Sequence, residues 1–111
     1  MYLNRAEALA KGATIAGATI MSDLKAITDN RNATPTATLG GVYEERAKEL
    51  AWEGHLWFDL ARTGRKMTRV DVSGTTIPTT LEAGDYRWAM PIPDREFTVN
   101  PNLVQNDGYS K

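Results

Sequence analysis

Two pairs of side chains at helical spacing are the residues of this sequence that could do chemistry. Glu49 and Glu53 are four residues apart, and so are His55 and Asp59. Residues four apart on a helix share a face. The first pair could therefore act as the acid and base of a glycoside hydrolase. The second pair could join a carboxylate to an imidazole for base catalysis or metal binding.

The arginine at position 46 favours a structural role for the two glutamates. Arg46 lies three residues before Glu49 and seven before Glu53, on the same sector of a helix. A guanidinium this close keeps both carboxylates ionised, whereas a general acid must hold a proton. We therefore predict a buried ion-pair network of these three residues, in which loss of one partner would cost roughly 3–5 kcal/mol.

The composition also favours a structural role for His55 and Asp59. The chain has one histidine and no cysteine, and these two side chains do not complete a metal site. No serine or threonine lies at a recognisable nucleophile position. Because buried polar groups are normally hydrogen-bonded, we expect the pair to bind the C-terminal segment. These residues thus favour structural over catalytic roles, and we predict no catalytic residue, no metal site and no cofactor.

Aromatic side chains are the remaining candidates for a binding site. Trp52 and Trp57 fall in the most apolar helical stretch, where we expect them in the core. Tyr86 and Trp88 lie between polar loops, before Pro91, in a segment predicted to be extended. They are the candidates for a surface platform that stacks on sugar rings, and packing is the favoured alternative. The ligand-binding residues are otherwise unknown.

Three helical segments are predicted to position these residues. A helix over residues 1–11 ends at Gly12, and a second runs from about Thr14 to about Arg31, which gives a helical hairpin. A long helix over residues 40–63 carries both candidate pairs and ends at Gly64, a favourable residue after a helix end.

The segment over residues 65–111 is predicted to be an irregular wrap. It has at most a small β-hairpin, with strands around Val70 and Thr76, because its prolines and turn residues exclude a long helix. Asp94 could begin a single helical turn that reaches about Val99. The expected fold is mainly α.

Length and charge exclude several classes of protein. At 111 residues, we expect the chain to form a single domain. A net charge of −1 and the lack of a basic run argue against nucleic-acid binding. The first helix has no capping residue ahead of Tyr2, so we expect a fragment of something longer. Such a fragment would expose Tyr2, Leu3 and Leu9 and could self-associate.

Three stretches resemble the SusD/RagB family in sequence and order. The first is Tyr2-Leu3-Asn4-Arg5-Ala6-Glu7-Ala8. The second is Glu45-Arg46-x-x-Glu49-Leu50-Ala51-x-Glu53-Gly54-His55-x-Trp57-Phe58-Asp59-Leu60-x-Arg62-x-Gly64. The third is Pro91-Ile92-Pro93-x-x-Glu96, followed by Asn100-Pro101-Asn102-Leu103-x-Gln105-Asn106-x-Gly108-Tyr109. The resemblance of the second stretch implies that it is a structural signature, carried by Arg46, Glu49, Glu53, His55, Trp57 and Asp59.

The resemblance implies the C-terminal fragment of an outer-membrane lipoprotein exposed on the cell surface. Such proteins bind oligosaccharides or other nutrients and deliver them to a TonB-dependent transporter, and they are not enzymes. It further implies that residues 1–31 are a tetratricopeptide-like helix pair and that the lipid anchor and most sugar contacts lie outside this chain. Two alternatives remain. One is a stand-alone helical-repeat module that binds proteins, and the less favoured one is a carboxylate glycoside hydrolase.

Overall fold

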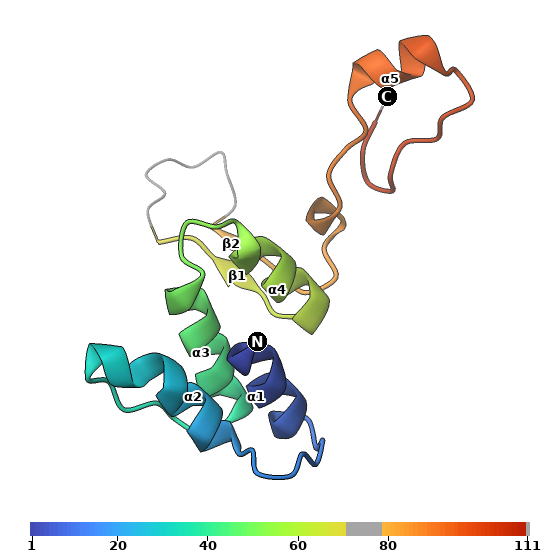
Figure 1. Ribbon diagram of the computed structural model, residues 1–111. Coiled ribbons are helices and arrows are strands. Elements are labelled where there is room, and N and C mark those ends of the chain that lie inside the picture. The colour runs from blue at the N-terminus through green and yellow to red at the C-terminus, as the bar shows by residue number, and fades with distance from the viewer. Residues whose placement is uncertain (71–78, 111) are drawn as a thin grey trace. The chain divides into compact units, whose positions relative to one another are not determined.

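The computed structural model describes residues 1–70 and 79–110 (Figure 1). This part of the chain is mainly helical with one small two-stranded sheet, so the predicted fold class is confirmed. The chain divides into two compact units, residues 1–56 and 57–111. Among the described residues, no helix has the length and apolar character needed to cross a bilayer.

The first unit is a three-helix layer. Its helices are α1 (Tyr2–Ala10), α2 (Ile20–Thr28) and α3 (Leu39–Glu49), and a 3₁₀ turn, η1 (Asp29–Arg31), extends α2. Helix α1 packs along α2, and α3 contacts both (Figure 1). Their facing sides bury a small core formed by Leu3, Ala6, Leu24 and Val42. Leu3 is therefore not exposed as expected, whereas Tyr2 is. The predicted helical hairpin therefore exists, and α3 supplies the third wall of its core.

Helix α2 is shorter than the sequence suggests, since it begins at Ile20 rather than near Thr14. A capping box sets this start: Ser22 N donates to Thr19 Oγ1 over 3.0 Å, and Thr19 N donates to Ser22 Oγ over 2.9 Å. Gly17, before the box, has a φ of +74°, which a right-handed helix does not allow. Local polar caps thus override the longer apolar stripe.

The single helix predicted over residues 40–63 is wrong, because two helices occupy this stretch. Helix α3 ends at Glu49, residues 50–54 form a turn, and α4 (His55–Thr63) begins after it. Gly54 has a φ of +76° and Trp52 a φ of +69°, both in the left-handed region. Glycine adopts this conformation at little cost and weakens a helix interior by about 1 kcal/mol relative to alanine. The turn leaves Trp52 fully exposed, not in the core as expected.

The second unit contains most of α4 and short elements after it. Strand β1 (Met67–Thr68) pairs antiparallel with β2 (Thr80–Leu81), with Met67 opposite Leu81. A small antiparallel sheet is therefore present, as the fold class allows, but its second strand lies after the predicted one, and residues 71–78, where most of the predicted strands were expected, lie outside the described residues. Helix α4 ends at Thr63, and Gly64 follows with a φ of +62°, as predicted.

Two short helical turns lie in the C-terminal segment. The 3₁₀ turn η2 (Tyr86–Trp88) replaces the first part of the stretch predicted to be extended. Asp85 caps it by accepting from Arg87 N over 2.9 Å, which explains why a turn forms there. Helix α5 (Asp94–Val99) has the predicted limits, and its first turn carries Asp94 and Glu96 near the positive end of the helix dipole.

A buried ion pair joins α1 to α2 inside the first unit. Arg5 donates two hydrogen bonds to Asp23, from Nε over 2.9 Å and from Nη2 over 2.5 Å. The Asp23 side chain is 1% exposed. The Arg5 guanidinium lowers the pKa of Asp23, chiefly through these hydrogen bonds. The pair therefore favours the charged carboxylate in the folded state.

Asp23→Asn is expected to lower the free energy of unfolding by about 2 kcal/mol at neutral pH, because it removes charged hydrogen bonds in a buried position. The folded pKa of Asp23 lies below the unfolded value, so its contribution is present above about pH 4 and is lost as pH falls through the folded pKa. Urea unfolding at pH 7 and near pH 2.5 measures both effects. The difference between wild type and variant should shrink in acid.

The matched control is Asp29→Asn, which removes the exposed Lys25–Asp29 pair at the end of the same helix. Exposed pairs contribute little, so a change below about 0.5 kcal/mol is expected at either pH. If Asp23→Asn behaved like this control, the buried pair would have no special stabilising role.

Candidate functional site

The two carboxylates of the hydrolase hypothesis do not share a helix face. Glu49 is the last residue of α3, and Glu53 lies in the turn before α4. Glu49 Oε2 lies 3.7 Å from Arg31 Nη2, and Glu53 Oε2 lies 3.8 Å from His55 Nε2. Both glutamates are exposed. Because the helix is interrupted between them, the spacing of four residues no longer aligns them for acid–base work.

The buried acid of this region is Glu45. Its side chain accepts from Arg31 Nη2 and from Lys48 Nζ, each over 2.7 Å, and the residue is 4% exposed. Glu49 lies at the edge of this cluster through Arg31. The acids predicted for the buried network are therefore wrong: Glu45 is buried, whereas Glu49 and Glu53 are exposed. The spacing of three residues between Glu45 and Lys48 indicates their pair. The contact of Arg31 with Glu45, in contrast, depends on how η1 packs.

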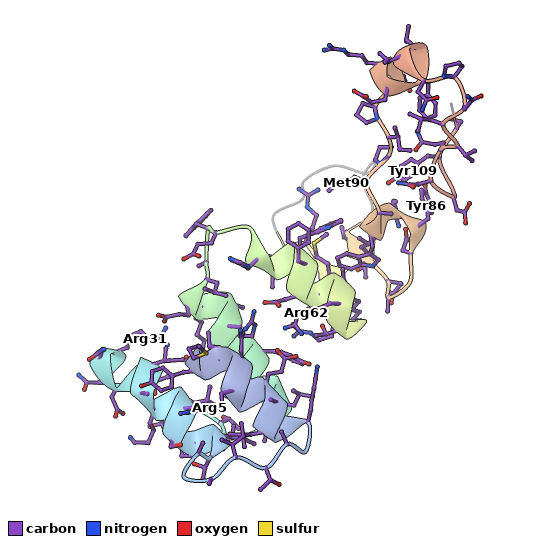
Figure 2. All side chains as sticks on the ribbon, turned by 45° about the vertical axis from the view of Figure 1, so that its right-hand side comes forward. Arg5, Arg31, Arg62, Tyr86, Met90 and Tyr109 are labelled. Carbon is purple, nitrogen blue, oxygen red and sulfur yellow. The ribbon has the colours of Figure 1, made fainter. Side chains whose placement is uncertain are left out.

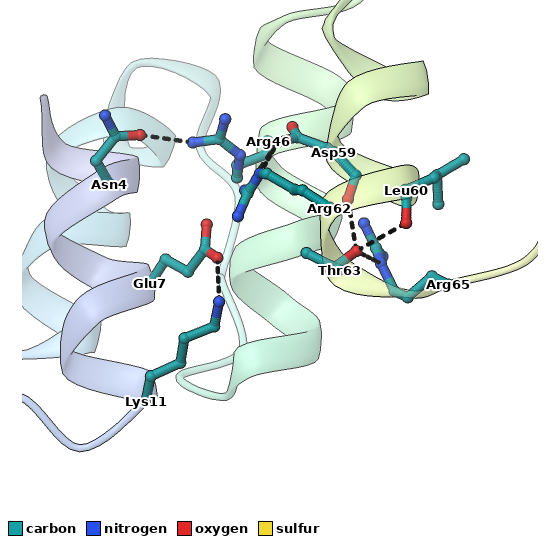
Figure 3. A network of polar contacts seen from close by, with 9 residues as sticks. All are labelled: Asn4, Glu7, Lys11, Arg46, Asp59, Leu60, Arg62, Thr63 and Arg65. Carbon is teal, nitrogen blue, oxygen red and sulfur yellow. Dashed lines mark hydrogen bonds and ion pairs between the residues drawn. The ribbon is translucent and has the colours of Figure 1, made fainter. Parts of the chain in front are cut away.

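The Arg46 side chain binds α1. Its Nη1 donates to Asn4 Oδ1 over 2.8 Å, a bond that joins α3 to α1 within the first unit (Figure 3). Glu7 on α1 accepts from Lys11 Nζ over 2.7 Å. These contacts connect helices or successive turns of one helix, as expected of residues that hold a fold together.

His55 and Asp59 lie in different surroundings. His55 is exposed at the start of α4, beside Glu53. Asp59 is buried and accepts from Arg62 Nε over 2.8 Å, and its main-chain carbonyl accepts from Thr63 Oγ1 over 2.5 Å (Figure 3). Thr63 in turn accepts from Arg65 Nε over 3.0 Å. This chain of bonds secures the last turn of α4, and its acid is held by a cation on the same helix.

The candidate aromatic platform is occupied by contacts within the second unit. Trp88 packs against Trp57 with ring centroids 4.6 Å apart, and its Nε1 donates to the carbonyl of Glu82 over 2.7 Å. Tyr86 meets the edge of Tyr109 at 5.0 Å (Figure 2). Tyr86 keeps 48% of its surface exposed. Trp88 is thus a packing residue, and Tyr86 is the more open of the two.

A second acid with a shifted pKa lies next to Tyr86. Asp85 accepts three hydrogen bonds from Arg87, from the main-chain N, from Nε and from Nη2. These bonds lower the pKa of Asp85 to about 2. A carboxylate held this firmly by one arginine acts as a cap for η2 and is a poor proton donor. Within the described ranges, no group of three or more His, Asp or Glu side chains is placed to hold a metal ion.

Comparison with known proteins decides the family. The model of the SusD family matches residues 1–109. The chain belongs to the SusD family. No curated protein matches the sequence.

Three solved structures from Bacteroides species resemble the SusD-family chain. A SusD superfamily protein from Bacteroides vulgatus is 35% identical, with a TM-score of 0.76, and the match covers 99% of this chain and 26% of that one. A protein from the same species whose proposed role is sugar binding is 32% identical, with a TM-score of 0.79 and coverage of 98% and 27%. A SusD superfamily protein from Bacteroides thetaiotaomicron is 35% identical, with a TM-score of 0.69 and coverage of 95% and 25%.

The SusD-family chain therefore spans about a quarter of the length of the structures it matches. The resemblance inferred from the sequence is confirmed, and the match extends over both compact units. The interrupted helix, with its exposed Trp52, falls within the matched region.

Proposed function

We propose that this chain is the C-terminal part of a cell-surface lipoprotein that binds oligosaccharides and delivers them to a TonB-dependent transporter in the outer membrane. The observation that carries the proposal is the family match over residues 1–109. It is supported by a structural relative, 32% identical, whose proposed role is sugar binding. A delivery protein needs a recognition surface and a docking surface, and it needs no catalytic group.

We also propose that the chain is not an enzyme. Glu49 and Glu53 are separated by the end of α3 and a turn, and each faces a different cation or imidazole. Asp59 and Asp85 are both neutralised by arginines close in sequence. The bonds from Arg87 lower the pKa of Asp85 to about 2, whereas a general acid must hold a proton near neutral pH. This and the separation of Glu49 from Glu53 are the reasons to set the hydrolase alternative aside.

Most contacts to sugar are proposed to lie outside this chain. Trp88 is held by Trp57 and by the carbonyl of Glu82, so its ring is not free to stack on a ligand. Tyr86 has an exposed portion but is in contact with Tyr109. The six signature residues, from Arg46 to Asp59, are proposed to serve the fold. The bonds of Arg46 to α1 and of Asp59 to Arg62 support this role.

A binding comparison tests the proposal. The longer parent protein and the 111-residue chain are titrated calorimetrically with a panel of neutral α- and β-linked oligosaccharides. The parent is expected to bind at least one of them, and the isolated chain at least about tenfold more weakly, because most ligand contacts are absent. Tyr86→Ala in the parent is expected to change the affinity less than about threefold. Loss of an aromatic ring that stacks on a bound sugar would weaken binding by more than this.

Two further outcomes would contradict the proposal. The first is hydrolysis of any oligosaccharide that disappears in both Glu49→Gln and Glu53→Gln variants, which would restore the enzyme hypothesis. The second is a parent that binds no sugar while the chain binds short peptides, which would favour a helical-repeat interaction module. Affinity capture of the tagged parent from solubilised outer membranes, with a β-barrel transporter recovered, checks the delivery step separately.

A further inference from the structure

The last residues of the chain hold an extended segment that cannot pair as a β-strand. Residues 89–93 include Pro91 and Pro93, which have no N–H, so Ile92 supplies the N–H donor between them. The Gln105 side chain binds both main-chain groups of Ile92. Ile92 N donates to Gln105 Oε1 over 2.8 Å, and Gln105 Nε2 donates to Ile92 O over 2.9 Å. A side-chain amide thus replaces the peptide group of a neighbouring strand.

The next residue extends this contact. Asn106 Nδ2 donates to the carbonyl of Met90 over 2.6 Å, and Asn106 N donates to Gln105 Oε1 over 2.9 Å. The carbonyls of Met90 and Ile92, two residues apart in the sequence, are thus each bound by one of two consecutive amide side chains.

A third contact, between Gly108 and Tyr86, is steric. Gly108 has a φ of +82°, and a Cβ at this position would overlap the Tyr86 ring at Cγ and lie 2.5 Å from Cδ2. The glycine backbone therefore lies directly against the ring, and Tyr109 meets the same ring edge-on at 5.0 Å. Figure 2 shows Tyr86 and Tyr109 together, near Met90.

We propose that residues 105–109 form a clasp that closes the loop over residues 93–104 and fixes the Tyr86 ring. The loop contains α5, and its ends are joined by the Gln105 contacts to Ile92. Compact loops closed at the base present a defined surface without a core of their own. The clasp makes the shape of this loop depend on two amide side chains and one glycine, and it does not depend on the sugar-binding proposal.

Tryptic cleavage after Arg95 reports the state of the clasp, because Arg95 is exposed in α5 inside the loop. Gly108→Ala is expected to raise the rate of this cut about tenfold, since the open population governs cleavage. Gly84→Ala is the matched control: Gly84 has a φ of +78° but a Cβ there would meet nothing within 4 Å. It carries the same backbone strain and should leave the rate within about twofold.

A second variant separates the clasp from a general loss of folding. Gln105→Met keeps the length of the side chain and removes the three hydrogen bonds of its amide, two of them to Ile92, so the exchange of the Ile92 amide hydrogen should accelerate about tenfold. Amide protection of Leu24 in the first unit should not change. In Tyr86→Ala/Gly108→Ala the two ring atoms of the overlap are gone and only the residue 86 Cβ, at 2.9 Å, remains, so the added effect of Gly108→Ala should fall toward that of Gly84→Ala.

Equal cleavage rates for Gly108→Ala and Gly84→Ala would overturn the proposal. So would an unchanged Ile92 exchange rate in Gln105→Met. Either result would mean that the loop is ordered by contacts other than those of residues 105–109.

Discussion

Gly41→Ala is expected to destabilise the chain by about 3 kcal/mol, because its Cβ has no room. It would overlap the main-chain oxygen of Thr36 and lie 2.9 Å from the Thr36 carbonyl carbon. Backbone atoms cannot rotate away as a flexible side chain can. Thr36 O also accepts from Thr38 N over 2.8 Å, and Thr38 caps α3 by accepting from Gly41 N over 3.1 Å. Relieving the overlap therefore disturbs the cap as well.

Gly40→Ala is the matched control one residue earlier in the same helix. A Cβ on Gly40 would meet only Thr38 Oγ1, at 3.8 Å, which is an ordinary contact. Because alanine favours a helix over glycine by up to about 1 kcal/mol, this variant should be neutral or slightly more stable. Urea unfolding of both variants gives the comparison. Similar destabilisation in the two would show that the first turn of α3 tolerates no side chain at all, and that the overlap with Thr36 is not the cause.

Leu24→Ala is expected to lower the free energy of unfolding by about 3 kcal/mol. Leu24 is fully buried at the centre of the first unit, where α1, α2 and α3 meet. The core around it is small, and its other buried members are Leu3, Ala6 and Val42. Two of its neighbours are thus no larger than valine, so the cavity left by the missing side chain has few large groups available to fill it.

Met21→Ala tests whether burial is the cause. Met21 lies on the same helix, three residues earlier, and is 38% exposed. It should cost less than about 1 kcal/mol, since most of its transfer free energy is not gained on folding. Thermal unfolding followed by circular dichroism provides the measurement. A loss at Leu24 no larger than that at Met21 would mean that the helices of the first unit are not held by this core.

Gly40 and Gly41 differ in a way that the sequence does not reveal. Both lie at the start of the helix predicted over residues 40–63. Nothing in the sequence distinguished one from the other. The difference depends on the Thr36–Thr38 turn folding back over α3, a contact between residues five apart that only the three-dimensional structure shows. The same holds for Gly108, whose neighbour Tyr86 is 22 residues away.

Ion pairs also fall into those that the sequence predicts and those that only the three-dimensional structure shows. Pairs on one helix follow from spacing, as Glu45–Lys48 and Asp59–Arg62 illustrate. Pairs between segments, such as Arg5–Asp23 and Arg31–Glu45, depend on how helices pack. The buried network predicted for Arg46, Glu49 and Glu53 requires an unbroken helix. Trp52 and Gly54 adopt left-handed backbone conformations, which interrupt the helix between α3 and α4.

Local propensity and motifs read in order along the chain predict the mainly helical class, the helix end at Gly64 and the family. The break in the long helix, the identity of the buried acid and the contacts of Tyr86 and Trp88 became known only from the three-dimensional structure. A propensity sums over neighbours in sequence, whereas burial and pairing require distant segments to meet. The amides of Gln105 and Asn106 acquire their role only where Met90 and Ile92 lie beside them.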